Sequence, residues 1–146
     1  MVQATWMRRI RGNTFPKSER LTSKEAFDHI FSKGESLRSG PFRIRFAFID
    51  KEESAIKTAF AVPKRLQKRA VDRNSIKRRM REAYRLNRHP LYERLLEKGV
   101  TLGMIIVYTS PTVPDSSEVR EKIMLLLKRL EEEVFPTSKK NTNEED

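Results

Sequence analysis

The stretch KRLQKRAVDRNSIKRRMREAYRLNR, from Lys64 to Arg88, decides the fold because it joins a helical apolar pattern to most of the positive charge. It holds 11 Lys and Arg against two acids, a net charge of +9, whereas the whole chain of 146 residues carries +11. On a helix at about 100° per residue, residues 74–87 form an apolar arc of Ile76, Met80, Ala83 and Tyr84. The opposite side is a polar stripe, mostly cationic, made of Asn74, Arg78, Arg81 and Arg85.

The charges on this helix indicate a polyanionic partner. Solvated helix faces usually mix opposite signs at i, i+4 spacing, but Arg73/Lys77 and Arg81/Arg85 are like-charged pairs. Arg73 and Lys77 also lie in the first turns, where the helix dipole disfavours cations. Because RNA or DNA would neutralise this arrangement, we expect a nucleic-acid-binding helix. Asp72 is the predicted N-cap.

Apolar periodicity places the other elements. A helix is predicted over 22–33, with Thr22 and Glu25 as a capping box and Gly34 as its stop. Residues 42–48 alternate as a strand, with the aromatic and aliphatic side chains inward and Arg43 and Arg45 on the other face. Further elements are strands over 35–38, 57–62 and 102–108, the last a central one, and a helix from about residue 118 to Pro136.

The order helix, strand, strand, strand, helix, strand, helix indicates an α+β plan with a mixed four-stranded sheet and three helices. We expect a flexible basic arm over 1–14, one RNA-binding domain over 15–135 and a disordered polar tail over 136–146. The arm lacks the apolar core of a secretory signal, and its composition fits a flexible arm better than a transit peptide. No apolar run reaches the roughly 18 residues of a membrane span. The chain has no Cys, which fits a cytoplasmic protein.

No catalytic constellation is visible. The two histidines, His29 and His89, have no metal-ligand spacing, and there is no Gly-rich phosphate loop or nucleophile elbow. The acids at 50–53 and 131–133 read as solvated surface rather than as a site for two Mg²⁺. We therefore expect no catalytic residue, bound metal or small-molecule substrate, and no nuclease activity of the protein alone.

Several motifs stand in order along the chain: Val62-Pro63-Lys64-Arg65, then Arg73-Asn74-Ser75-Ile76-Lys77-Arg78-Arg79 and Arg81-Glu82-Ala83-Tyr84-Arg85, together with Arg20-Leu21, Phe27 and Phe31. In these motifs the chain resembles the protein subunit of bacterial ribonuclease P. The chain departs from the family at Ser75, where a second Arg is usual, and at Pro63, where a small residue is commoner. The resemblance covers about residues 15–133.

The resemblance implies a fold like the second domain of ribosomal protein S5, with a left-handed crossover between the third and fourth strands. It implies a ribonucleoprotein that removes the 5′ leader of precursor tRNA, with catalysis carried by an RNA subunit and Mg²⁺ held mainly by that RNA. The candidate contacts to the catalytic RNA are Arg73, Asn74, Lys77, Arg78, Arg81 and Arg85. The candidate leader-binding cleft comprises Phe27, Phe31, Arg43, Arg45, Lys64 and Arg65.

Other interpretations stay open at this point. Phe27, Ile30 and Phe31 share one helix face, which by itself favours simple core packing over stacking on RNA bases. A ribosomal or other structural RNA-binding protein would explain the charge and the aromatic residues equally well. A DNA-binding regulator of the helix-turn-helix type would need a second helix just before the basic one, where we predict a strand and a loop.

Overall fold

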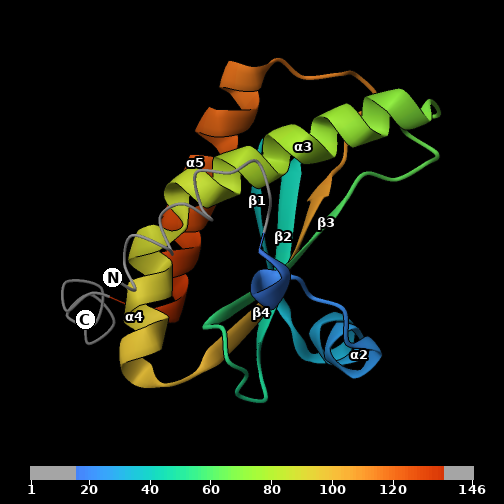
Figure 1. The fold of residues 1–146 in the computed structure, drawn as a ribbon. Coiled ribbons are helices and arrows are strands. Elements are labelled where there is room, and N and C mark those ends of the chain that lie inside the picture. Colours follow the sequence, from blue (N-terminus) through green and yellow to red (C-terminus); the bar gives the residue numbers. More distant parts are fainter. Residues whose placement is uncertain (1–15, 137–146) are drawn as a thin grey trace, which may run out of the picture.

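The computed structural model describes residues 16–136, which form a four-stranded sheet with helices on both faces (Figure 1). The predicted arm 1–14 and nearly all of the predicted tail lie outside the described residues. In chain order the elements are η1 (Lys17–Glu19), α2 (Lys24–Lys33), β1 (Glu35–Ser39), β2 (Phe42–Ile49), β3 (Ile56–Ala61), α3 (Ala70–Asn87), α4 (His89–Lys98), β4 (Thr101–Tyr108) and α5 (Ser116–Val134).

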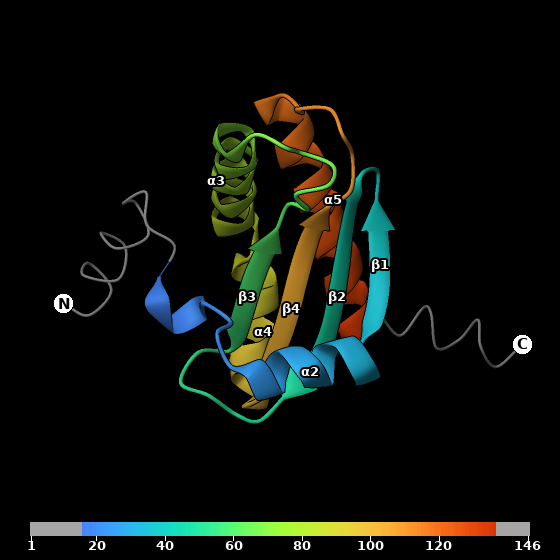
Figure 2. The same ribbon diagram turned by 90° about the vertical axis from the view of Figure 1, so that its right-hand side faces the viewer.

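The sheet is mixed and has the strand order β1-β2-β4-β3. β2 is antiparallel to β1 and to β4, and β3 is parallel to β4. β4 is central, as its apolar run predicts, and all its residues except Val107 are buried. In Figure 2, β3 and β4 run upward, β4 lies to the right of β3, and α4 returns behind the sheet, so this crossover is left-handed.

The prediction of three helices is wrong, because the described part of the chain contains four α-helices and a short 3-10 helix. The additional helix is α4, which begins directly after the basic helix. Pro90 occupies its first turn, where a missing N–H costs nothing. Leu91 and Leu95, one turn apart, are buried, and Gly99 ends the helix with a left-handed φ of 67°.

The two faces of the sheet bury different amounts of apolar surface. α2 crosses one face, where Ile30 packs with Leu21 and Ile105. The helices α3, α4 and α5 cover the other face and enclose the larger core (Figure 2). Alternation in β2 buries Phe42, Ile44 and Phe46 there, but Phe48, the next residue in the alternation, is 50% exposed and so is not buried as predicted. No helix among residues 16–136 is long and apolar enough to cross a membrane.

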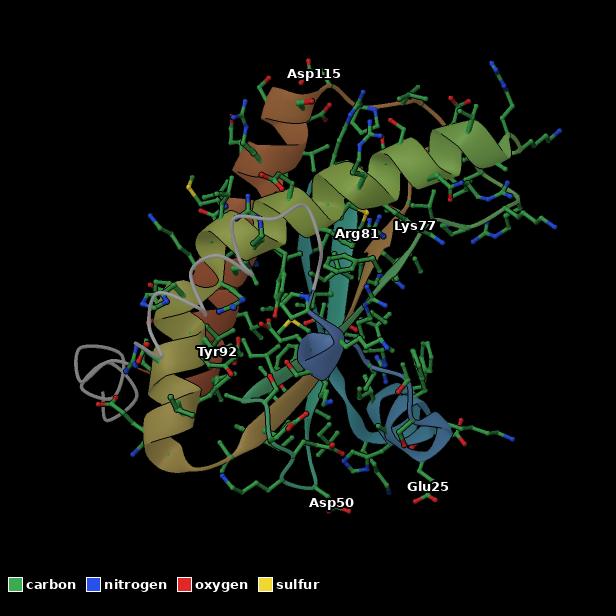
Figure 3. The ribbon with its side chains drawn as sticks, viewed as in Figure 1. Glu25, Asp50, Lys77, Arg81, Tyr92 and Asp115 are labelled. Atoms are coloured by element: carbon green, nitrogen blue, oxygen red, sulfur yellow. The ribbon has the colours of Figure 1, made fainter. Side chains whose placement is uncertain are left out.

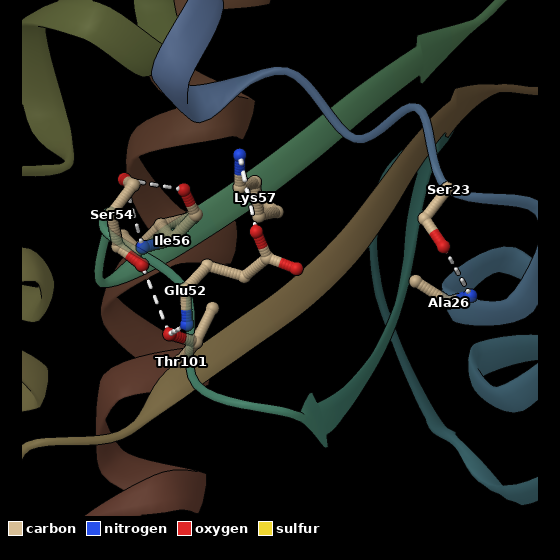
Figure 4. Close-up of polar contacts among 7 residues, drawn as sticks. All are labelled: Ser23, Ala26, Glu52, Ser54, Ile56, Lys57 and Thr101. Atoms are coloured by element: carbon tan, nitrogen blue, oxygen red, sulfur yellow. Dashed lines mark hydrogen bonds and ion pairs between the residues drawn. The ribbon is translucent and has the colours of Figure 1, made fainter.

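Local hydrogen bonds fix the ends of α2 and the turn before β3. Ser23, not the predicted Thr22, caps α2, and its hydroxyl accepts from the Ala26 N–H at 3.2 Å (Figure 4). The cap lies one residue later than predicted because the helix begins at Lys24. In the turn, the Glu52 N–H donates to the Thr101 hydroxyl at 2.9 Å, which ties the turn to β4.

Candidate nucleic-acid interface

The basic helix α3 is anchored by the predicted apolar arc. Ile76, Met80, Ala83 and Tyr84 are all buried in the larger core, which confirms the assignment of faces. The predicted N-cap is wrong, because Arg69 holds that position without a side-chain cap and Asp72 lies in the first turn. A strand and a loop precede α3, so the arrangement differs from that of helix-turn-helix proteins.

The basic loop before α3 is held by Arg73 of α3 and by Gln67 within the loop. Arg73 donates from Nη1 to the carbonyl oxygens of Gln67 and Lys68, both at 2.9 Å. Gln67 is buried, and its amide donates to two carbonyl oxygens in the loop after β4. Arg73 therefore has a structural role in this loop. Lys64 and Arg65 are exposed on the same loop.

The stripe residues of α3 differ in their exposure. Asn74 and Arg78 are exposed, whereas Lys77 and Arg81 are half-buried on the flank that looks toward β3 and α2 (Figure 3). Burial lowers the pKa of the Arg81 guanidinium, and the charges of Arg20 and Arg78 lower it further. The stripe is thus a crowded positive surface rather than a row of independent cations.

Arg85, the last stripe residue, is less available than its position suggests. Its side chain is 15% exposed, and its Nη2 lies 2.6 Å from Oε1 of Glu82. Its Nε also donates to the other carboxylate oxygen at 3.3 Å. This i, i+3 pair fixes the guanidinium on the helix surface.

The aromatic residues of α2 divide between core and surface. Ile30 is fully buried and Phe27 is half-buried against the small core under α2. Phe31 is 57% exposed, so core packing does not account for it. An exposed ring of this kind can stack on a nucleic-acid base.

The two arginines of β2 lie on the α2 side of the sheet but differ in their bonding. Arg45 donates from Nε to the Ile30 carbonyl at 3.1 Å, and from Nη2 to the Phe31 carbonyl at 2.6 Å. The Ile30 carbonyl also accepts from the Gly34 N–H at 2.9 Å, so Arg45 adds a second hydrogen bond there and joins the end of α2 to β2. Arg43 is exposed and pairs with Val107 of β4, farther along the sheet. Arg45 is thus committed to the fold, whereas Arg43 faces solvent.

The predicted cleft residues are spread from one end of the sheet to the other rather than gathered in one compact pocket. α2, with Phe27 and Phe31, crosses one end of the sheet, while the loop with Lys64 and Arg65 leaves β3 at the other end (Figure 2). Arg43 lies between them on β2, three residue pairs from the Phe46↔Met104 pair. The arrangement therefore suits an extended strand of nucleic acid better than a single small ligand.

A buried ionic network beside α3 was not predicted from the sequence. Glu19, on η1, accepts from the Tyr84 hydroxyl at 2.7 Å and from Arg88 Nη2 at 2.8 Å. Burial raises the pKa of the Glu19 carboxyl, and the charge of Arg88 and the Tyr84 hydrogen bond partly offset this. Glu19 precedes Tyr84 by 65 positions and Arg88 by 69, so no local sequence pattern could have revealed this network. It attaches the segment before α2 to the end of α3.

A groove between α3 and the first turns of α5 was also missed. Its volume is about 490 Å³. The lining residues are Arg78, Arg79, Arg81, Glu82, Arg85, Leu86, Ser116 and Arg120. Five of these eight are arginines and one is an acid, so the groove is strongly positive. The run of cations in the sequence of α3 indicates the α3 wall of the groove. Arg120 comes from an ordinary amphipathic helix, so its place in the groove has no comparable sequence signal.

Among residues 16–136, no three His, Asp or Glu side chains come together as metal ligands. The polar clusters described above are the positive groove and the buried network in which Glu19 is paired with Arg88. Chemically, the arrangement can bind phosphate groups and stack bases.

Comparison with known proteins gives one consistent result. The Ribonuclease P family matches residues 15–131. The "Ribonuclease P protein component" of Porphyromonas gingivalis is 31% identical over 126 residues, which cover 86% of this chain and 92% of the relative. The protein of the same name from Chlorobaculum tepidum is 33% identical over 130 residues, covering 82% and 84%.

Solved structures share the fold. The RNase P protein from Thermotoga maritima is 27% identical, with a TM-score of 0.57 over 76% of this chain and 96% of that one. The RNase P protein of Staphylococcus aureus superposes with a TM-score of 0.60 at 23% identity, covering 78% and 96%.

Proposed function

The chain belongs to the family of bacterial ribonuclease P protein components, which are subunits of an endoribonuclease in tRNA processing. From this premise we propose that two surfaces of the protein bind two different RNAs. The α3 surface binds the catalytic RNA, and the α2 side of the sheet binds the 5′ leader of precursor tRNA. Because the chain belongs to this family, we prefer this function to the alternative of a structural RNA-binding protein without a role in cleavage.

The observation that carries this proposal is the difference between the two surfaces. α3 presents exposed polar and cationic groups, Asn74 and Arg78, suited to phosphate and sugar contacts. The α2 side presents an exposed ring, Phe31, together with Arg43, suited to an unpaired strand whose bases can stack. Lys64 and Arg65 lie at the boundary of the two surfaces, on the loop between β3 and α3.

We propose further that the RNA subunit carries the catalysis and holds most of the Mg²⁺, and that the protein alone does not cleave RNA. The name "protein component" given to the relatives implies at least one other component. The protein then acts by positioning precursor tRNA on the catalytic RNA. We place this assembly in the cytoplasm.

The first test is reconstitution with the cognate RNA and Mg²⁺. Protein plus RNA should release the leader at low salt, whereas protein with Mg²⁺ but without RNA should leave precursor tRNA intact. Robust cleavage by RNA-free protein, surviving repurification and nuclease treatment, would contradict the division of labour.

The second test separates the surfaces with matched variants. Arg78→Ala should weaken assembly with the RNA and lower the log-log salt slope by roughly 0.7 to 0.9, because one phosphate contact is lost. The control is Lys98→Ala, which removes an exposed cation at the end of α4 and should change neither assembly nor the salt slope.

Phe31→Ala should leave assembly with the catalytic RNA unchanged. It should weaken the binding of precursor tRNA relative to that of leaderless tRNA by about 1 to 3 kcal/mol, without a change in salt slope. Phe48→Ala removes a similarly exposed ring from the other face of the sheet and should leave this ratio unchanged. Equal losses for leaderless and leader-bearing tRNA in Phe31→Ala would place the leader elsewhere.

A further inference from the structure

The groove between α3 and α5 lies away from the leader-binding side of the sheet. α5 covers the face opposite to α2 (Figure 2), so the α5 wall of the groove, which carries Arg120, lies on the other side of the sheet from Phe31. A single extended strand lying along the α2 side would not need to enter the groove. Two segments of RNA can therefore be bound at once.

The lining of the groove selects a kind of ligand. It contains five arginines and no aromatic ring, so it can bind phosphates but offers no platform for stacking bases. Glu82 is its one carboxylate, and Arg85 is its ion-pair partner. The other four arginines leave an excess of positive charge in the lining. That composition matches a sugar-phosphate backbone rather than an unpaired, sequence-read strand.

Two of the arginines are already held in place. Arg79, on the α3 wall, donates through Nη1 to the carbonyl oxygen of Pro114, just before α5. Arg85 is fixed by its two hydrogen bonds to Glu82. Because these side chains are ordered before any ligand arrives, less conformational entropy is lost on binding.

Given the proposed RNA-binding function, on which this inference rests, we propose that the groove extends the α3 contact with the catalytic RNA onto α5. In this site the RNA crosses from α3 onto α5, and Arg120 contacts a phosphate from the far wall. The contact surface for the catalytic RNA thereby includes α5, beyond the motif-bearing helix.

The test uses the full chain and the cognate catalytic RNA, with binding measured over a series of salt concentrations. Arg120→Ala should weaken binding about threefold or more and lower the salt slope by roughly 0.7 to 0.9. Lys128→Ala removes an exposed cation from the same helix outside the groove and should have no such effect.

A second variant gives a change in the opposite direction. Glu82→Gln removes the carboxylate from the groove and should tighten RNA binding severalfold with a steeper salt slope, whereas Glu97→Gln on α4 should not. A general loss of folding would weaken binding in both groove variants, so tighter binding by Glu82→Gln cannot arise from that cause. The leader preference should stay unchanged in both.

The outcomes separate this inference from the function on which it rests. If Arg78→Ala weakens assembly but Arg120→Ala and Glu82→Gln match their controls, the RNA contacts α3 without reaching α5, and the inference fails while the proposed α3 contact stands. If Arg78→Ala also has no effect, the proposed α3 contact fails as well.

Discussion

Removing Arg88 should reveal how strongly the buried network holds the segment before α2 against α3. The side chains of Glu19 and Arg88 are 4% and 3% exposed, with 2.8 Å between Oε2 and Nη2. Arg88→Met keeps most of the packing volume but leaves the buried Glu19 carboxylate without its ion-pair partner. Breaking a buried pair in this way costs about 3 to 5 kcal/mol, a large share of the roughly 5 to 15 kcal/mol that holds a domain folded.

The pH dependence of this loss follows from the pKa of Glu19. Burial already raises that pKa above 4.5, and Arg88 opposes the rise. Arg88→Met should therefore raise it further, so that folding takes up a proton. For an acid with a raised folded pKa, the stabilising contribution is fully present below about 4.5 and is lost as the pH rises through the folded value. The variant should thus be closest to the parent in acid.

Urea unfolding followed by circular dichroism, over a series of pH values, measures both effects. The double variant Glu19→Gln/Arg88→Met removes both charges but keeps an acceptor for the Tyr84 hydroxyl, so it should recover part of the loss. A loss below about 1 kcal/mol for Arg88→Met, or a double variant as unstable as the two single losses added together, would refute the reasoning.

Two further predictions concern α2. Ser23→Ala should lower the free energy of unfolding by about 1 kcal/mol because the Ala26 N–H loses its acceptor, whereas Thr22→Ala should be nearly neutral; equal losses in urea melts would contradict the cap assignment. Gly34→Ala should lower the thermal midpoint, since a Cβ there would lie 2.3 Å from a carbonyl oxygen of α2 and 2.7 Å from one of β2; an unchanged midpoint would show that the backbone can move apart.

Local patterns determined most of the elements, α4 excepted, and which of their faces are apolar. The arc on α3 was predicted correctly because helical periodicity alone fixes which side chains share a face. The same holds for Phe42, Ile44 and Phe46 of β2 and for the buried run of β4. The resemblance of the Arg73 motif to its family likewise needs no tertiary structure.

Missed local features have local reasons. Pro90 was compatible with ending α3, yet it also suits the first turn of a new helix, and the pattern of α4 is short. Thr22 and Ser23 are both good caps, so the start of α2 depends on where the chain enters from η1. Phe48 keeps the alternation of β2 but is half-exposed, because burial at a strand end depends on the reach of the neighbouring helices.

The role of each polar side chain was decided by tertiary structure. Arg43 and Arg45 look equivalent in sequence, yet Arg45 bonds to the end of α2 because β2 runs beneath that helix, and Arg43 lies beyond it. Glu19 reaches Arg88 only because the segment before α2 runs beside β3, where Arg20 pairs with Thr58. Sequence determined that this chain presents cations to a polyanion; the path of the backbone determined which cations remain available, since a guanidinium binds whichever carbonyl or carboxylate the fold brings within reach.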